Sequence, residues 1–307
     1  MEIGLYAEST GLDSLDDVLA RMARLGLTRI ELGTGGQSDR PFLDASRLLA
    51  SADARRELVA KLAGHGLRLS ALNISAFTMH PRVGDAHARL VRDTMRLAGL
   101  LELDRVIVQS GVPGDAPGAA IPNWVVYPWP PDTADVVKRQ WEAGIALWTD
   151  LAATGRQEGV TRLCFEMHPL NLVHNPPTLL HLREAVGPAI GANFDPSHLM
   201  WIGCDIPACI RMLRGAVYHV HIKDVRMMSQ NLATVGVLDS RPWASFRERP
   251  WTFCTPGFGH DAIWWRQFFE ALSDIGYDDV ASIENEDPYL PGFAGVERTV
   301  SFLRTIL

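Results

Sequence analysis

The feature that most constrains the fold is a regular alternation of short β-like runs and amphipathic helical patterns along all 307 residues. Such an alternation is typical of βα units and a parallel sheet. Eight such units without a break in composition favour one closed (β/α)8 barrel, a TIM barrel, over a doubly wound sheet with a second domain. We therefore predict a single α/β domain over residues 1–307. Its expected strands are Ile3–Ala7, Arg29–Gly33, Arg68–Ile74, Arg105–Ser110, Arg162–His168, Gly191–Asp195, Val217–Lys223 and Val280–Glu284.

Two long interruptions of this pattern, 111–132 and 224–260, are expected to be loops. Each follows a strand, so each should hang over the face of the barrel where active sites lie. In the first loop Trp124, Tyr127 and Trp129 are flanked by prolines, which makes a stiff aromatic surface. That surface either stacks on a bound ligand, or packs against the barrel rim or a neighbouring subunit.

Charge and composition exclude several classes of protein. The formal net charge of −7 is spread without a basic block, so attraction to nucleic acid or to an anionic membrane has no evident source. No segment has the pattern of a signal peptide or a membrane span, and we expect a cytoplasmic protein. Four scattered cysteines do not suggest a disulfide framework or a thiolate metal site, and we expect buried thiols. They are Cys164, Cys204, Cys209 and Cys254.

Metal-ligating side chains stand at the ends of the last four predicted strands: Glu166, Asp195, His221 and Glu284. The carboxyl ends of barrel strands converge on one mouth, where acids and imidazoles would repel or stay unpaired unless a cation neutralised them. Three carboxylates and one imidazole suit Mn²⁺ best, with Mg²⁺ or Co²⁺ possible, and do not resemble structural zinc sites. We predict one divalent cation here.

Each of these residues also has a simpler interpretation, because one acid at a strand end is commonly a helix N-cap or a solvated loop charge. Four such residues at equivalent positions of successive strands favour the metal site. The seventh strand carries both His219 and His221. We expect only one of them to point into the barrel, and we choose His221 because it lies nearer the end of the strand.

Four motifs make the whole chain resemble the xylose isomerase-like superfamily of sugar phosphate isomerases and epimerases. The motifs are Phe165-Glu-Met-His-Pro169, Gly191-Ala-Asn-Phe-Asp-Pro-Ser-His-Leu199, His219-Val-His-Ile-Lys-Asp224 and Ser282-Ile-Glu-Asn-Glu-Asp287. The resemblance implies that the four ligands named above bind the metal. By the same resemblance Glu166 and Glu284 also transfer protons, and His198 contacts the substrate. These motifs are specific for the fold and the metal site but not for the substrate.

One substrate-binding residue of the related ketose 3-epimerases is missing. The arginine that they place six residues after the metal histidine is Met227 in this chain. Lys223 and Arg226 are candidate replacements. Further candidates are His80 as an extra base or hydroxyl ligand, and His168 as a wall of the site or a support for its neighbour. Gln109, Trp124 and Trp129 complete the predicted substrate contacts.

A closer likeness is to a subgroup that includes 3-keto-glycoside epimerases and the catalytic subunits of C-glycoside-cleaving enzymes. It rests on Pro122-Asn-Trp124, Pro128-Trp-Pro130 and Gly236-Val-Leu-Asp239. Both chemistries begin by removing a proton beside a ketone. The likeness implies an oligomer, with a small non-identical subunit if the enzyme cleaves C-glycosides.

The predicted activity is therefore that of a metal-dependent isomerase or epimerase acting on a small carbohydrate, a keto-sugar or a 3-keto-glycoside. The alternative is a lyase that expels a leaving group from the same enediolate. A DNA-repair endonuclease of the same superfamily would need more histidines and an Asp-x-His pair, which does not occur between Asp224 and His260. Strand eight is followed by Asn285-Glu-Asp-Pro288, which would repel a phosphate, so we expect an unphosphorylated substrate.

Overall fold

Eight parallel strands hydrogen-bond into a closed barrel in the order β1-β10-β7-β6-β5-β4-β3-β2, which confirms the predicted fold class. The computed structural model describes residues 1–38, 41–127 and 129–307, so the predicted Pro128 motif position lies outside the described residues. The barrel strands are β1 (Glu2–Tyr6), β2 (Arg29–Gly36), β3 (Arg68–Ser75), β4 (Arg105–Val108), β5 (Arg162–Glu166), β6 (Ile190–Phe194), β7 (Val217–Ile222) and β10 (Val280–Ile283).

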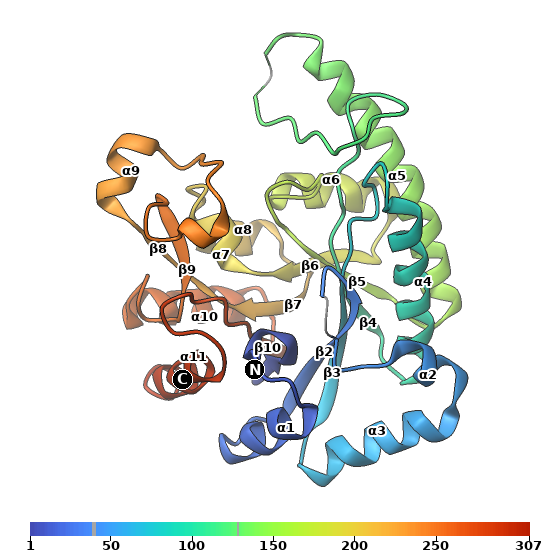
Figure 1. The fold of residues 1–307 in the computed structure, drawn as a ribbon, viewed down its shortest axis with the longest axis vertical. Helices are drawn as coiled ribbons and strands as arrows, with labels where there is room; N and C mark the ends of the chain where they lie inside the picture. The colour runs from blue at the N-terminus through green and yellow to red at the C-terminus, as the bar shows by residue number, and fades with distance from the viewer. Residues whose placement is uncertain (39–40, 128) are drawn as a thin grey trace.

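Helices cover the outside of the barrel, with α3, α4 and α5 on one side of the strands and α10 and α11 on the other (Figure 1). The principal helices are α1 (Leu15–Arg24), α3 (Ala52–Gly64), α4 (Gly84–Leu100), α5 (Thr133–Gln157), α6 (Pro176–Val186), α8 (Ile206–Met212), α10 (Ala262–Asp274) and α11 (Phe293–Leu303). Shorter helical segments are η1 (Ala7–Thr10), α2 (Ala45–Ala50) and α7 (Pro196–Met200). None of the helices in the described ranges is both long and apolar enough to span a membrane.

The packing of α10 follows the spacing of its aromatic residues. Trp265, Phe268 and Phe269 are buried against the barrel, and Trp264 is half-buried beside them.

The expectation of buried thiols holds for Cys164 and Cys254. Cys204 and Cys209 are only half-buried. All four are free thiols.

The segment 224–260 is not the simple loop that we predicted. It forms an antiparallel pair of strands, β8 (Asp224–Met227) and β9 (Trp251–Cys254), with helix α9 (Ser229–Val235) and a short 3-10 turn, η2 (Trp243–Ser245), between them. The reason is apolar burial, because Val225, Trp251 and Phe253 pack with Trp201 in a small core of their own. In Figure 1 this segment is the orange lobe beside the barrel.

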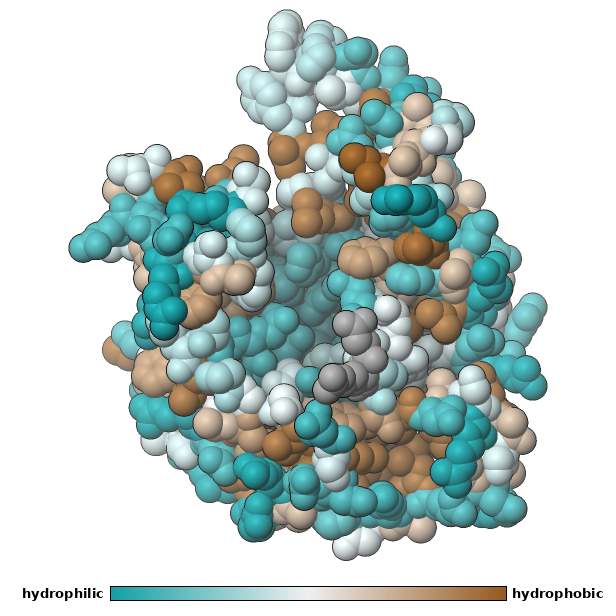
Figure 2. All heavy atoms as spheres, viewed as in Figure 1, coloured by the Kyte–Doolittle hydropathy of each residue, from teal (hydrophilic) through white to brown (hydrophobic). Residues whose placement is uncertain are grey.

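The predicted loop 111–132 has no helix or strand in its described part. Gln140 of α5 holds it in place, since its side-chain amide donates to the carbonyl oxygen of Asn123 at 2.7 Å. The indole of Trp148, also on α5, donates to the carbonyl oxygen of Ser110 at 3.2 Å, just before the loop begins. Figure 2 shows a hydrophilic hollow in the face between this loop and the 224–260 segment.

Trp148 should also be a principal anchor of α5. It is fully buried, and its ring meets that of Phe165 on β5 edge-on with centroids 4.5 Å apart. Trp148→Ala should lower the free energy of unfolding by about 3–5 kcal/mol, because it leaves a large cavity and removes one of the two hydrogen bonds that the Ser110 carbonyl accepts. Trp141→Ala, at a half-buried position of the same helix, should cost about 1 kcal/mol or less. Urea unfolding followed by circular dichroism measures both, and equal losses would contradict this role of Trp148.

Candidate metal centre

Strand alternation places Glu166 inside the barrel. Residues two apart on a strand share a face, so Glu166 follows the interior Cys164, while Phe165 between them faces outward to α5. Asp195 comes directly after β6 and caps α7, where its Oδ1 accepts from the backbone N–H of Ser197 at 2.8 Å. The cap fixes the carboxylate and leaves Oδ2 for the site.

Glu284 and His221 come from the neighbouring strands β10 and β7. The N–H of Glu284 donates to the carbonyl of Ile222 at 3.2 Å, which ties the two strand ends together. His221 Nδ1 then lies 3.0 Å from Glu284 Oε2 and 3.6 Å from Glu166 Oε1. Donor atoms of these residues and Asp195 all lie within 4.8 Å of one another. The four predicted ligands are thus brought into one group.

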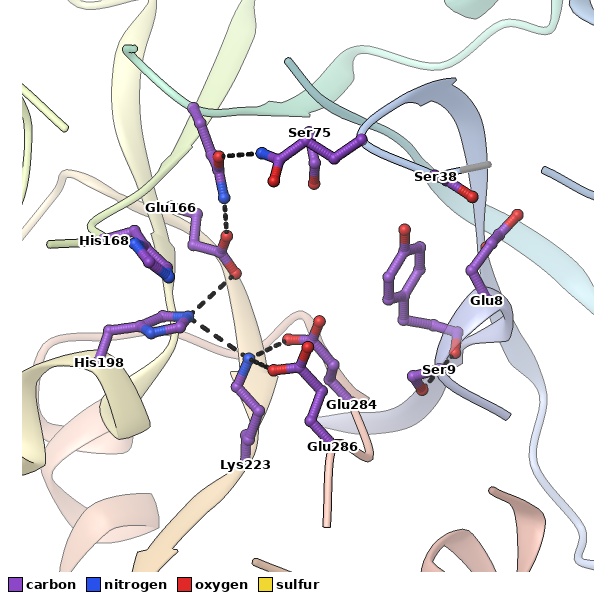
Figure 3. A pocket seen from close by; sticks show the side chains of 13 residues that line it. Glu8, Ser9, Ser38, Ser75, Glu166, His168, His198, Lys223, Glu284 and Glu286 are labelled. Carbon is purple, nitrogen blue, oxygen red and sulfur yellow. Dashed lines mark hydrogen bonds and ion pairs between the residues drawn. The ribbon is translucent and has the colours of Figure 1, made fainter. Parts of the chain in front are cut away.

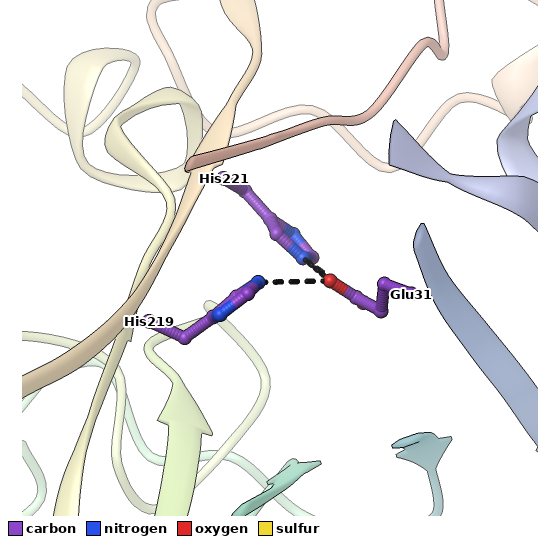
Figure 4. A group of neighbouring side chains, drawn as sticks. All are labelled: Glu31, His219 and His221. Carbon is purple, nitrogen blue, oxygen red and sulfur yellow. Dashed lines mark hydrogen bonds and ion pairs between the residues drawn. The ribbon is translucent and has the colours of Figure 1, made fainter. Parts of the chain in front are cut away.

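The prediction for His219 was wrong, because both histidines point into the barrel (Figure 4). Residues 219 and 221 are two apart, and a strand places such residues on the same face. His219 Nε2 lies 3.0 Å from Glu31 Oε2, and His221 Nε2 lies 3.1 Å from both carboxylate oxygens of Glu31. Asn73 donates to the same carboxylate at 2.8 Å.

Glu31 therefore orients the predicted metal histidine. A carboxylate that accepts from one ring nitrogen fixes the other nitrogen for metal binding, an arrangement common around metal ligands. Since His221 Nε2 faces Glu31, Nδ1 is the atom that faces Glu166 and Glu284. Burial acts to raise the pKa of Glu31, but His221 and His219 lower it, so this carboxylate stays ionised inside the barrel.

Lys223 is fully buried among the acids at the barrel mouth. Its Nζ lies 3.0 Å from Asp195 Oδ2, 2.8 Å from Glu284 Oε2 and 2.9 Å from Glu286 Oε2. Burial would lower the pKa of Lys223, yet the surrounding carboxylates, led by those of Asp195 and Glu284, raise it well above its ordinary value. The ammonium group offsets part of the buried negative charge.

The carboxylates of Glu166 and Asp195, two of the predicted metal ligands, remain ionised. Burial acts to raise the pKa of Glu166, but the imidazoles of His198 and His221, 3.7 and 3.6 Å from its Oε1, hold that pKa well below its usual range. Burial also acts to raise the pKa of Asp195. The positive charge of Lys223, and to a smaller extent that of His198, lowers this pKa below its ordinary value. Both groups are therefore available as anionic oxygen ligands at neutral pH.

The residues of the site fit a divalent cation. Three carboxylates and an imidazole nitrogen converge, and the buried Asp195 Oδ2 has the Lys223 ammonium at 3.0 Å but accepts no well-aligned hydrogen bond from the described residues. Such a donor set suits oxygen-preferring divalent ions. Glu166 and Glu284 also line an open cavity, so a cation held here would keep coordination positions for a substrate.

That cavity has a volume of about 370 Å³ and mainly polar walls. In Figure 3, Glu166, His198, Lys223, Glu284 and Glu286 converge on one side, with Glu8 and Ser9 across the cavity. The lining residues are Tyr6, Glu8, Ser9, Gln37, Ser38, Ser75, Gln109, Glu166, His168, His198, Lys223, Glu284 and Glu286. This lining can hydrogen-bond to a molecule rich in hydroxyl groups.

Four of the predicted substrate contacts line the cavity. Gln109 donates to Glu166 Oε2 at 2.7 Å, and His198 Nε2 lies 3.3 Å from Asp195 Oδ2. The rings of His168 and His198 are 4.2 Å apart, so His168 forms a wall of the cavity, with Lys223 next to them.

The other candidates lie elsewhere. Trp124 lines a neighbouring apolar cavity, and its ring meets that of His174 edge-on. His80, Arg226 and Trp129 do not line the metal cavity. His80 Nδ1 accepts from a loop N–H at 3.1 Å, Arg226 donates to the Phe258 carbonyl at 3.2 Å, and the Trp129 ring is largely exposed.

Sequence reasoning missed Glu8, Glu31 and Glu286. Glu31 had a signal, a carboxylate inside the apolar second strand, but nothing in the sequence connected it to His221. Glu286 was considered only for its repulsion of phosphate. Glu8 directly follows the predicted first strand, Ile3–Ala7, which is the kind of position that indicated the four ligands.

A family model described as xylose isomerase-like TIM barrel matches residues 19–306. The chain belongs to this family. It is 37% identical over 308 residues to Uncharacterized protein YfiH of Bacillus subtilis (strain 168), covering 99% of this chain and 98% of the relative. Family membership and the barrel geometry agree, but they do not identify the substrate.

Solved structures of this barrel align along nearly the whole chain. The probable 3-DHS dehydratase AsbF of Bacillus anthracis has a TM-score of 0.69 at 15% identity, covering 99% of each chain. The IOLI protein, solved with a binding zinc atom, has a TM-score of 0.68 at 18% identity, with 100% of this chain and 98% of that chain covered. D-Psicose 3-epimerase from Clostridium cellulolyticum H10 has a TM-score of 0.62 at 18% identity, with coverage of 100% and 91%. These likenesses show a shared fold.

The first prediction from the site concerns Glu8, whose burial raises its pKa to about 7 from an ordinary 4.5. The unfolded carboxyl group loses its proton at lower pH, so the free energy of unfolding should fall as pH rises from about 4.5 to 7. Glu8→Gln removes this term. Its stability relative to the wild type should increase over that interval by roughly 3 kcal/mol at most.

Urea unfolding at pH 5 and at pH 8 measures this difference. Glu142→Gln, on the exposed face of α5, is the control for the loss of a surface carboxylate. A pH-independent difference between Glu8→Gln and the wild type would show that the Glu8 carboxyl is not protonated near neutral pH.

The second prediction concerns cation binding. Isothermal titration of chelator-treated protein with Mn²⁺ should show one site per chain. Asp195→Asn should weaken it by at least about 100-fold, and Glu31→Gln by about 10- to 100-fold through the orientation of His221. His80→Ala should bind as the wild type does. Unchanged affinity in Asp195→Asn would place the cation elsewhere.

Proposed function

We propose that this protein is an enzyme, a sugar isomerase or epimerase that depends on a divalent metal ion. Mn²⁺ is the metal that we propose first. Its substrate is a keto-sugar or a 3-keto-glycoside, and its first step removes the proton on the carbon beside the carbonyl. The observation that carries this proposal is that Glu166 and Glu284 enter one polar cavity from different strands. Two carboxylates around one substrate position can take a proton and return another.

Four residues would hold the cation, namely Glu166, Asp195, His221 and Glu284. When bound, it would supply the positive charge that makes a carbon beside a carbonyl acidic enough for a carboxylate base. Both glutamates are held in position. Gln109 donates to Glu166, and Lys223 donates to Glu284. Each of them keeps its second oxygen for a ligand or a proton.

The proton steps then follow from these positions. One glutamate accepts the proton from the carbon beside the carbonyl. The electron pair of the broken C–H bond is delocalised onto the carbonyl oxygen, which gives an enediolate. Return of a proton to the opposite face of the same carbon inverts it, which is epimerisation. Return to the former carbonyl carbon, together with transfer of the neighbouring hydroxyl proton to the former carbonyl oxygen, moves the ketone along the chain, which is isomerisation.

The charge around the cavity supports an unphosphorylated substrate. Among the described lining residues the acids are Glu8, Glu166, Glu284 and Glu286, of which Glu8 is partly protonated at neutral pH, and the only lysine or arginine is Lys223. Its ammonium is already paired with three carboxylates. A phosphate dianion would therefore meet more repulsion than attraction here.

A lyase is the second candidate, and the apolar cavity beside the metal cavity favours it. Their linings share His168 and Glu286, so a substrate can extend from one into the other. If a group attached two bonds from the carbonyl carbon leaves with its bonding electrons, the electron pair of the enediolate forms a C=C bond and the departing group takes up a proton. The known relatives in fold include a protein named as a dehydratase.

The decisive experiment uses the Mn²⁺-loaded protein in D₂O with methyl 3-keto-glucoside and with free ketoses. NMR should show deuterium entering beside the carbonyl, with an epimer, an isomer or an eliminated product. Glu166→Gln and Glu284→Gln should each lower this exchange by at least about 100-fold, because an amide is no base.

Trp141→Ala, at a half-buried position of α5 that lines neither cavity, is the matched control. Exchange in Glu284→Gln at the wild-type rate would exclude this residue as a base. A sugar phosphate that exchanges far faster than its unphosphorylated counterpart would overturn the proposed substrate class.

A further inference from the structure

A second cavity, of about 490 Å³, adjoins the metal cavity and differs from it in chemistry. Its walls are mainly apolar, and most of them belong to the 224–260 segment. The lining residues are Trp124, His168, Pro169, Leu170, Trp201, Val237, Leu238, Asp239, Trp243, Arg249, Trp251, Phe253 and Glu286. Its volume falls in the range of about 300–1,000 Å³ that is typical of pockets for small organic ligands.

Packed aromatic rings give this cavity rigid walls. Trp201 and Trp251 stack with centroids 4.4 Å apart, and Trp243 lies 5.2 Å from Phe253. On its other side Phe253 faces the metal site, where its ring is 5.4 Å from that of His198 and 4.7 Å from Lys223 Nζ. Phe253 therefore stands between the two cavities.

Arg249 adds a largely buried cation to these walls. Its guanidinium lies 5.0 Å from the ring centres of both Trp243 and Trp251. One of its terminal nitrogens donates to the carbonyl of Arg241 at 2.7 Å. Although Arg249 is only 7% exposed, its Nε is buried without a hydrogen-bond partner among the described residues. A buried donor of this kind indicates a missing acceptor.

Several apolar side chains at the rim of the cavity are exposed to solvent. Leu170 and Leu238 are each 64% exposed and Trp243 is 43% exposed. Leu170 also has a φ of 72°, a left-handed conformation that a leucine adopts only at a cost in energy. Exposed apolar groups around a preformed cavity are typical of a binding site.

We propose that this cavity binds the flat aromatic aglycone of a glycoside whose keto-sugar ring lies in the metal cavity. The inference rests on the proposed function and specifies its substrate class. Indole and phenyl walls favour a planar aromatic ring over a second sugar, and the guanidinium of Arg249, a lining residue, offers hydrogen-bond donors to an acceptor oxygen on that ring. The shared walls His168 and Glu286 mark where the glycosidic bond would lie.

The first test compares kcat/KM for an aryl and a methyl 3-keto-glucoside in the Mn²⁺-loaded protein. The wild type should prefer the aryl substrate by at least about tenfold. Trp243→Ala should lower this ratio about tenfold, and Trp243→Phe, which retains a ring, should restore most of it. Trp141→Ala should leave the ratio unchanged. A wild-type ratio near one would overturn the proposal.

The second test measures binding without catalysis. 7-Hydroxychromone, a flat aromatic with acceptor oxygens, should quench the tryptophan fluorescence and bind the wild type. Trp243→Ala and Arg249→Met should each weaken it about tenfold, with melting curves to verify folding. No binding by folded wild type would overturn the proposal. The proposal would also be overturned if the protein forms dimers without 7-hydroxychromone and Leu238→Asp dissociates them. The cavity would then be an interface between two copies of the chain.

The two proposals fail in different ways. If 7-hydroxychromone binds as expected but no keto-sugar exchanges its proton, the proposed function is wrong and the aromatic cavity stands. If methyl 3-keto-glucoside exchanges but the aryl substrate gains nothing, the proposed function stands and the aglycone site is wrong.

Discussion

The structure of the barrel mouth depends on the pairing of buried carboxylates with a few cationic or proton-donating groups. Asp195 and Glu284 share the ammonium of Lys223, and Glu166 lies between His198 and His221. Unpaired charges at this depth would cost several kcal/mol each. The excess of carboxylates over fixed cations is what makes the mouth attractive to a divalent ion.

A second layer of polar residues inside the barrel supports this arrangement. Glu31 accepts from His219 and His221 and is itself fixed by Asn73. Since these side chains come from β2, β3 and β7, the position of one metal ligand depends on the register of strands that are far apart in the chain. Closing the barrel and building the site are therefore coupled.

Much of the fold and the candidate site could be predicted because the carboxyl ends of parallel strands must converge. That rule was enough to bring Glu166, Asp195, His221 and Glu284 together from positions up to 118 residues apart in sequence. It could not reveal Glu31, whose role depends on which residues face it across the barrel interior. The error over His219 came from applying the two-residue period of a strand wrongly, and not from missing information.

The 224–260 segment was harder to predict because its strands are stabilised by tertiary contacts and not by a local sequence pattern. Its strands are four residues each, and they are stabilised by Trp201, which lies outside the segment. Short strands of this kind carry little periodic signal. Glu8 escaped notice for a related reason, since the burial of a residue after a strand depends on the elements that cover it.

The place of Phe253 has a consequence for how this family can diversify. This residue belongs to the 224–260 segment and to a separate small apolar core, yet its ring packs against His198 and Lys223 of the metal cavity. The aromatic side chains of this segment can therefore change without removing a hydrogen bond between the barrel strands. New ligand preferences can therefore arise by mutation in a segment whose apolar core is separate from that of the barrel, while the carboxylates at the barrel mouth stay unchanged.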